Sequence, residues 1–427
     1  MGSLWIGVIG LWELFLSTAV HLVFGLYIFS AGVASISRSS HRPARTSDGG
    51  SIPPIVLVHG IFGFGKGRLG SLSYFGGAEK KDDRVLVPDL GSLTSVHDRA
   101  RELFYYLKGG RVDFGEEHSR ACGHRRFGRV YEQGHYPEWD EHHPAHFVGH
   151  SAGVQVVRVL QKMLADKAFE GYESTSEDWV LSVTSLSGAL NGTTRTYMDG
   201  MMPEDWKSVK LVSLLQLCRL GCIVYEWLDL QWMKKYYSFG FDHFGMAWRE
   251  GGVGRSSTAC WATSARALQL NAGLRTFPNT FYFSYATKRT RKFLGLTLPS
   301  TVLGIHPLLF IRTLQMTQWR HPPAAPPPTR AIDWEDNDGA LNTLSMTHPR
   351  LPVEHPSHFV VDDSECHPLQ PGIWYYKILE ADHIFFVLNR DRAGVQFDLM
   401  YDTIFQRCRK HAFRTAPPPT LPNHVPH

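Results

Sequence analysis

The chain has 427 residues, with 44 Lys and Arg against 40 Asp and Glu, and 43% of its residues are hydrophobic. This length suffices for two domains or for one α/β domain with insertions. The net charge of +4 is small and no run of Lys or Arg forms a basic face, so a nucleic-acid partner is not expected. The six cysteines are too irregular to indicate a disulfide framework.

The N-terminal segment, residues 1–37, is apolar almost throughout and contains one formal charge, Glu13, before Arg38. Its length can span a bilayer. We therefore expect an N-terminal anchor in a membrane-associated protein of the endoplasmic reticulum or another endomembrane. A cleaved signal segment of a secreted protein is the main alternative, and a buried core helix is another. Residues 38–52 are rich in Ser, Arg and Gly and indicate a linker.

The first core elements follow this linker. Apolar runs predict buried strands at 55–58 and 85–88, and helical spacing of apolar residues predicts a helix from about His97. A histidine-rich stretch that we expect to be a loop comes next. Histidine and aspartate side chains bind zinc, so His118 and His124, with Asp98 at the helix start, are candidate zinc ligands. Solvated histidines in a polar loop are the alternative.

A short apolar strand then leads into Gly-His-Ser-Ala-Gly and a predicted helix. In such a G-x-S-x-G turn the glycines leave room for a sharp bend that exposes the serine, here Ser151, as a nucleophile. The N–H of Ala152, at the helix start, would stabilise an oxyanion. The second donor would be the N–H of Ile61, because His59-Gly60 follows the first strand. Ordinary glycine-rich turns are the alternative for both segments.

Residues 191–250 interrupt the alternation of strands and helices. Lys207–Trp232 has many apolar residues and few charges, which predicts a helix. We expect a lid or cap over an active site, and a helix packed on the core is the alternative.

The remaining elements complete a domain at 53–412, followed by a proline-rich tail at 413–427. Strands are predicted at 179–186, 280–287 and 374–379, and a helix at 396–408. The pattern predicts an α/β-hydrolase fold, with a mostly parallel central sheet, helices on both faces and a helical lid insertion.

Such hydrolases place the acid and then the histidine after the nucleophile. His383 follows the last strand and is the candidate base, which would take the proton of Ser151. Asp338 precedes Gly339 and is the candidate acid. Three other carboxylates remain alternatives from the residues alone: Asp333, Asp336 and Asp382.

Several motifs between about residues 55 and 405 resemble those of the thermoalkalophilic, zinc-containing triacylglycerol lipases of Bacillus-type organisms and their staphylococcal relatives. The apolar N-terminus lies outside this resemblance, and we interpret the chain as a plant member of the superfamily. The motifs are His59-Gly60-x-x-Gly63-x-Gly65, Tyr74-Phe75-Gly76-Gly77, Asp98-Arg99-Ala100, Gly110-x-Val112-Asp113-Phe114-Gly115-x-x-His118, Gly123-His124-x-Arg126-Phe127-Gly128-Arg129 and Asn337-Asp338-Gly339.

The resemblance implies Ser151 as nucleophile, Asp338 as acid and His383 as base. It also implies a structural zinc ion that ties the lid-side insertion to the core. Its ligands would be Asp98, His118, His124 and Asp229, although Leu230 is an extra residue before the Gln-Trp pair that follows the family's fourth acid. The family's calcium ligands fall on Phe385 and Arg390, so calcium is not expected.

We therefore predict a serine hydrolase that cleaves carboxylic esters of lipids through an acyl-enzyme, most specifically a triacylglycerol lipase. Its substrate would be presented at a membrane or lipid-droplet surface. Two alternatives are a lipid acyltransferase that uses the same site and a non-catalytic, membrane-tethered lipid-binding protein.

Overall fold

A computed structural model describes most of the chain from residue 52 to residue 410. The described residues are 15, 52–66, 72–92, 94–202, 208–217, 267, 270–302, 304–319, 334–350, 357–361, 369–388 and 393–410. The predicted tail at 413–427, most of the predicted anchor at 1–37 and much of the predicted lid at 191–250 lie outside them.

The prediction of a membrane-anchored protein is wrong. Among the residues that the structure describes, no helix is both long and apolar enough to cross a membrane. The apolar composition of residues 1–37 suggested such a helix, but apolar composition alone does not distinguish a membrane span from other apolar segments.

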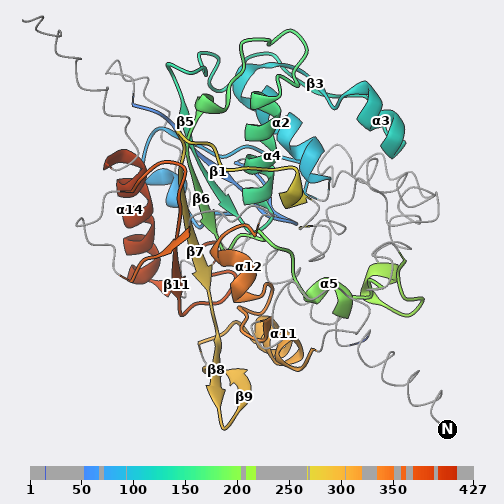
Figure 1. The fold of residues 1–427 in the computed structure, drawn as a ribbon, viewed down its shortest axis with the longest axis vertical. Helices are drawn as coiled ribbons and strands as arrows, with labels where there is room; N and C mark the ends of the chain where they lie inside the picture. The colour runs from blue at the N-terminus through green and yellow to red at the C-terminus, as the bar shows by residue number, and fades with distance from the viewer. Residues whose placement is uncertain are drawn as a thin grey trace, which may run out of the picture.

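A seven-stranded sheet forms the centre of the fold, and all of its neighbouring strands are parallel (Figure 1). Its four central strands are buried along their whole length, as expected for a parallel sheet that is covered on both faces. In spatial order the strands are β10 (Ser357–Phe359), β11 (Trp374–Leu379), β7 (Phe281–Thr287), β6 (Val180–Leu186), β5 (Ala145–His150), β1 (Ile55–Val58) and β2 (Val85–Leu86).

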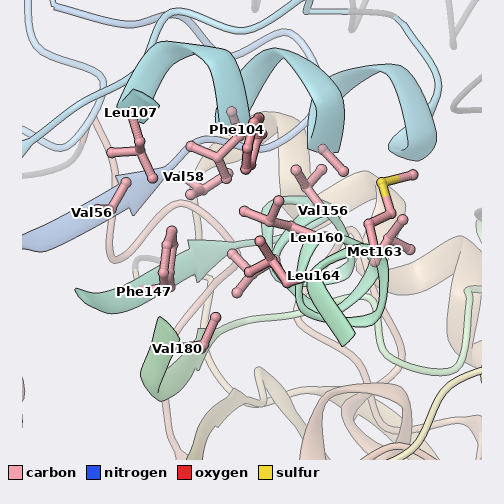
Figure 2. Packing of buried hydrophobic residues seen from close by; sticks show 14 of the residues in the cluster. Val56, Val58, Phe104, Leu107, Phe147, Val156, Leu160, Met163, Leu164 and Val180 are labelled. Atoms are coloured by element: carbon pink, nitrogen blue, oxygen red, sulfur yellow. The ribbon is translucent and has the colours of Figure 1, made fainter. Parts of the chain in front are cut away.

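Helices cover both faces of this sheet. Helices α2 (Val96–Lys108) and α4 (Gly153–Ala165) pack on one face, where Figure 2 shows Phe104 and Leu160 against Val56 and Phe147. Helix α14 (Val395–Lys410) packs on the other face, where its apolar side contacts a second cluster that includes Ile55 and Leu57. Successive residues of β1 thus supply opposite cores, as the two-residue period of a strand requires. The predicted α/β-hydrolase fold is confirmed.

The histidine-rich stretch differs from the predicted loop. It forms β3 (Gly110–Asp113), α3 (Glu116–Cys122) and β4 (Phe127–Tyr131), and β3 pairs with β4 in an antiparallel ribbon. The guanidinium of Arg126 donates two hydrogen bonds to the Asp113 carboxylate, at 2.9 and 2.7 Å, across this ribbon. A side-chain pair of this kind stabilises the ribbon without the apolar periodicity that sequence analysis relies on.

Several short elements were not predicted. They are strand β10, the antiparallel hairpin of β8 (Thr290–Phe293) and β9 (Leu296–Pro299), the helices α5 (Arg195–Met198), α11 (Pro307–Gln318) and α12 (Thr343–Thr347), and the 3₁₀ turns η1 (Ala78–Lys80) and η2 (Glu177–Trp179). The hairpin, α11 and α12 follow β7 and lie near its carboxyl end in Figure 1. This is the edge of the sheet at which the loops after β5 and β11 also emerge.

Candidate active site and metal cluster

Ser151 lies at the sharp turn between β5 and α4. Its φ of 55° falls in the left-handed region, which is strained for a residue other than glycine. The flanking glycines are needed for close packing. A Cβ on Gly149 would lie 2.4 Å from the backbone N of Val154, and one on Gly153 would lie 2.2 Å from the carbonyl O of Val58. The G-x-S-x-G sequence therefore has a steric cause in this fold.

Three loops bring Ser151, His383 and Asp338 together. The Nε2 atom of His383 lies 3.1 Å from Ser151 Oγ, and its Nδ1 lies 2.8 Å from Asp338 Oδ2. An Nδ1–H that donates to Asp338 leaves Nε2 as an acceptor, so the serine hydroxyl donates to His383. This arrangement can move the serine proton onto the imidazole as Oγ attacks a carbonyl.

The carboxylate of Asp338 is fully buried and fully hydrogen-bonded. Its Oδ1 accepts from the backbone N–H groups of Ala340 and Leu341 at 2.9 and 2.8 Å, and its Oδ2 also accepts from Thr287 Oγ1 at 2.6 Å. Burial by itself raises the pKa of this carboxyl, but the nearby His383 and the hydrogen bonds outweigh burial and lower it. Asp338 therefore stays ionised and can hold His383 in one tautomer.

The alternative acids lie elsewhere. Asp382 Oδ2 accepts from the backbone N–H of His306 at 2.8 Å, and Asp336 accepts from the side chains of Lys288 and Thr290, each at 2.7 Å. Asp333 lies outside the described residues. Of the carboxylates that the structure describes, Asp338 is the one that contacts the His383 ring.

The two predicted oxyanion donors flank the serine. Within the described part of the chain, the N–H groups of Ile61 and Ala152 have no hydrogen-bond acceptor. The turn that contains Ile61 lies directly against the serine, since a Cβ on Gly60 would be 2.9 Å from Ser151 Cβ. Both donors are thus available to a ligand oxygen beside Ser151 Oγ.

A second set of hydrogen bonds, which was not predicted from the sequence, joins the turn after β1, the end of β5 and the loop that contains His383. The N–H of Gly60 donates to Tyr74 Oη at 3.3 Å, Tyr74 Oη lies 2.9 Å from His150 Nδ1, and His150 Nε2 lies 3.1 Å from the carbonyl O of His383. Because a carbonyl only accepts, His150 Nε2 must donate and Nδ1 must accept from the tyrosine hydroxyl. Burial, the main cause, lowers the pKa of His150 to about 3, so its ring is neutral.

Three imidazoles surround one carboxylate oxygen at the start of α2. From Asp98 Oδ1, the distance is 3.0 Å to His118 Nε2, 3.5 Å to His97 Nδ1 and 3.6 Å to His124 Nε2. The donor atoms of His97, Asp98 and His118 all lie within 4.8 Å of one another, and so do those of His118, Cys122 and His124. The sequence analysis did not consider His97 or Cys122 as ligands, although His97 directly precedes Asp98.

The chemistry of this cluster fits a metal ion. A tetrahedral zinc site with bonds of about 2.0–2.2 Å has ligand atoms about 3.3–3.6 Å apart. The distances of 3.0, 3.5 and 3.6 Å from Asp98 Oδ1 to the three imidazoles are close to this spacing. Asp98 is fully buried. Burial opposes protonation of His118, but the hydrogen bond to Asp98 outweighs it and raises the pKa of this imidazole to about 9. Asp229 and the calcium-related Arg390 lie outside the described residues, and Phe385 offers no ligand atom.

Comparison with known proteins identifies relatives of this chain. Residues 52–185 match the family model described as "Lipase-like, C-terminal domain". The chain is related to bacterial lipases. It is 27% identical to a lipase of Staphylococcus hyicus over 366 residues, which cover 75% of this chain and 51% of that protein. It is 35% identical to lipase 1 of Staphylococcus aureus (strain MRSA252) over 164 residues, which cover 33% of this chain and 24% of that protein.

The chain thus spans about half the length, or less, of these relatives. They are bacterial, and they do not support the interpretation of a plant member. Solved structures with the same fold include the S. hyicus lipase, with a TM-score of 0.64, 24% identity and coverage of 83% of this chain and 94% of that one. EstA from Clostridium botulinum has a TM-score of 0.61, 24% identity and coverage of 87% and 90%.

Proposed function

We propose that this protein is a serine hydrolase that cleaves carboxylic esters of lipids, and specifically a triacylglycerol lipase. The observation that supports this most directly is the hydrogen-bonded series from Ser151 Oγ through the His383 ring to Asp338. The lipase relatives support a lipid ester as the substrate class. We further propose that this substrate is presented at a membrane or lipid-droplet surface.

In the proposed reaction, His383 Nε2 takes the proton of Ser151 as Oγ attacks the ester carbonyl carbon. The N–H groups of Ile61 and Ala152 stabilise the oxyanion of the tetrahedral intermediate. The protonated imidazole then gives its proton to the departing alcohol, which leaves an acyl-enzyme on Ser151. Water then attacks the acyl carbon as His383 takes its proton, the bond to Ser151 Oγ breaks, and the imidazolium returns the proton to Oγ as the fatty acid leaves. Asp338 stabilises the imidazolium at both stages.

We also propose that zinc binds at the cluster around Asp98, with a structural role. Asp98, His118, His124 and His97 offer four ligand atoms on α2 and on the segment that contains α3, and zinc prefers four such ligands. His97 then takes the place that the sequence analysis gave to Asp229. The ion would join α2, which packs on the sheet, to the ribbon and helix beside it.

The division of the chain is part of the proposal. The hydrolase domain is 53–412, and the insertion at 191–250 is its lid. Its described beginning lies beside the acid loop, because Thr194 N donates to the Asn342 side chain at 2.9 Å. Leu211 and Val212 in this insertion are 84% and 45% exposed, which suits a segment that meets an apolar substrate.

The test is labelling of the full chain with a fluorophosphonate probe, combined with fatty-acid release from emulsified triacylglycerol. Ser151→Ala should lose both signals. Asp338→Asn should lower kcat by about 10⁴-fold, because the neutral amide no longer holds the required His383 tautomer. Asp336→Asn is the matched control, since this neighbouring carboxylate binds Lys288 instead of His383.

Labelling without fatty-acid release would retain the hydrolase and exclude the lipase. No labelling of folded wild-type protein would exclude the serine nucleophile. Equal losses in Asp338→Asn and Asp336→Asn would contradict the assignment of the acid.

A further inference from the structure

The β8–β9 hairpin projects from the carboxyl edge of the sheet, directly after β7 (Figure 1). Its base is attached to the loop that contains the triad acid. The N–H of Arg289 donates to the Asn337 carbonyl at 2.9 Å, and the N–H of Asn337 donates to Thr290 Oγ1 at 3.3 Å. The hairpin tip is about 10–13 Å further out, at 3.3 Å per strand residue. It therefore projects from the edge of the sheet at which Ser151 lies.

One face of the hairpin exposes apolar side chains together with Arg291. Phe293 pairs with Leu296, and Arg291 pairs with Leu298, so these four side chains share a face. Phe293 is 57% exposed and Leu296 is 62% exposed. Leu294, in the turn, is 87% exposed. Burial in the protein core does not account for these apolar side chains.

The turn residue Leu294 is unfavourable in two respects. The two-residue turn has φ values of 49° at Leu294 and 79° at Gly295, as in a type I′ turn. Glycine, asparagine and aspartate are preferred at such positions, and leucine is strained there. A Cβ built on Gly295 has no other atom within 4 Å, so the turn is not packed against the protein. Because an exposed, strained leucine does not stabilise the folded protein, its presence here indicates a role in binding.

Two basic side chains flank the apolar tip. Arg291 and Lys292 are both exposed, and neither forms an ion pair with a residue that the structure describes. Apolar side chains that enter the acyl region, with basic side chains at the level of anionic headgroups, form the usual pattern of a segment bound to a lipid surface. The charge and apolarity of this tip thus favour a lipid surface over another protein.

We propose that the β8–β9 hairpin is a lipid-surface docking element, in which Phe293, Leu294 and Leu296 insert into an anionic lipid surface and Arg291 and Lys292 bind its headgroups. Docking in this way turns the carboxyl edge of the sheet, and with it Ser151, toward the lipid. That this orientation serves catalysis rests on the proposed function, but binding of the hairpin to lipid does not.

The test is co-sedimentation of the full chain with phosphatidylcholine vesicles, with and without phosphatidylglycerol. Leu294→Asn should reduce the vesicle partition coefficient at least about tenfold. It should also raise the midpoint of thermal unfolding, because asparagine tolerates the positive φ. This opposite effect on stability distinguishes lost binding from misfolding. Leu399→Asn is the control, since Leu399 is a 54% exposed leucine on α14.

The paired substitution Arg291→Gln with Lys292→Gln should reduce binding to vesicles with phosphatidylglycerol and leave the weaker binding to pure phosphatidylcholine unchanged. Equal binding by the wild type and Leu294→Asn, or no vesicle binding by the wild type, would overturn the proposal. So would a loss of self-association in Leu294→Asn with vesicle binding unchanged, since the apolar face would then bind a second copy. Ser151→Ala should bind vesicles as the wild type does, so a failed lipase assignment would leave the docking result interpretable.

Discussion

At the scale of single residues, hydrogen bonds from side chains outside the triad connect the loops around Ser151 and His383. Tyr74 provides such hydrogen bonds, because its hydroxyl accepts from the N–H of Gly60, beside the proposed oxyanion donor Ile61, and donates to His150. His150 in turn donates to the His383 carbonyl. One phenol thus fixes the relative positions of three loops. We interpret it as a positioning residue for all of them.

Tyr74→Phe should lower kcat on a soluble ester about tenfold and leave KM nearly unchanged. Misplaced loops reduce stabilisation of the transition state more than they reduce binding of the substrate. It should also reduce the free energy of unfolding by about 1–3 kcal/mol, because two buried polar groups lose their partner. Steady-state kinetics and urea unfolding measure the two effects. Tyr401→Phe is the control, because the buried hydroxyl of Tyr401, which lies on α14, donates to the Phe386 carbonyl at 2.7 Å. If both variants lost activity equally, the positioning role of Tyr74 would be refuted.

At the scale of elements, strand β5 has a titratable group in its buried face. The ring of His146 is fully buried, with Nδ1 2.7 Å from Ser182 Oγ on β6. Burial, with a smaller effect of Arg409, lowers the pKa of His146 from 6.5 to about 3. Between these two values the unfolded chain binds a proton that the folded chain does not bind. The stability contributed by the neutral ring is therefore lost as the pH falls below about 6.5.

The fall in unfolding free energy from pH 7 to pH 5 should be smaller in His146→Gln than in the wild type by about 2 kcal/mol. Urea unfolding at the two pH values measures this difference. Ser182→Ala removes the hydrogen bond but keeps the imidazole, so it should lower stability while retaining the pH dependence of the wild type. An unchanged pH dependence in His146→Gln would show that His146 is not the group responsible.

A second prediction at this scale concerns the fourth zinc ligand, which we propose is His97 in the first turn of α2. His97→Asn should weaken zinc binding at least about tenfold, whereas Asp229→Asn should have little effect. Competition with a chromophoric chelator measures the affinity, and the visible spectrum of the cobalt form reports ligand number independently of activity. His135→Asn is the control, because this ring stacks on Tyr106 outside the cluster. A larger loss of zinc affinity in Asp229→Asn than in His97→Asn would instead support Asp229 as the fourth ligand.

At the scale of the whole molecule, sequence was a good guide wherever burial alone decides the structure. The central strands are rich in apolar residues because they are covered on both faces, and the predicted strands at 55–58, 179–186 and 280–287 match β1, β6 and β7 to within one residue. The predicted strand at 374–379 is also present as β11, although only its first residue, Trp374, is buried. The order of serine, acid and histidine followed from the fold. This order does not distinguish Asp338 from Asp382 as the acid, because the acid is the carboxylate that forms a hydrogen bond with the His383 ring in the folded chain.

Two of the elements that were missed depend on features other than apolar periodicity. The β3–β4 ribbon depends on the pair of Arg126 and Asp113, and the β8–β9 hairpin has leucine where a turn residue is expected. His97 is also in this class. His118 and His124 are more than twenty residues further along the chain, and only folding brings these imidazoles to the Asp98 carboxylate beside His97. Local patterns do not contain such information.

The proposed zinc site links the stability of the segment at 110–131 to that of the main core. Zinc at about 100-fold above its Kd should stabilise the folded chain by about 2.7 kcal/mol, which corresponds to a rise of a few degrees in the thermal midpoint. Chelator should reverse the rise and speed proteolysis within 110–131, because α3 and the ribbon then lose their link to α2. Asp98→Asn should abolish both responses to zinc. Since the thermal midpoint is measured without substrate, this result is independent of activity. A thermal midpoint that is unchanged by zinc and chelator in the wild type would exclude a structural ion.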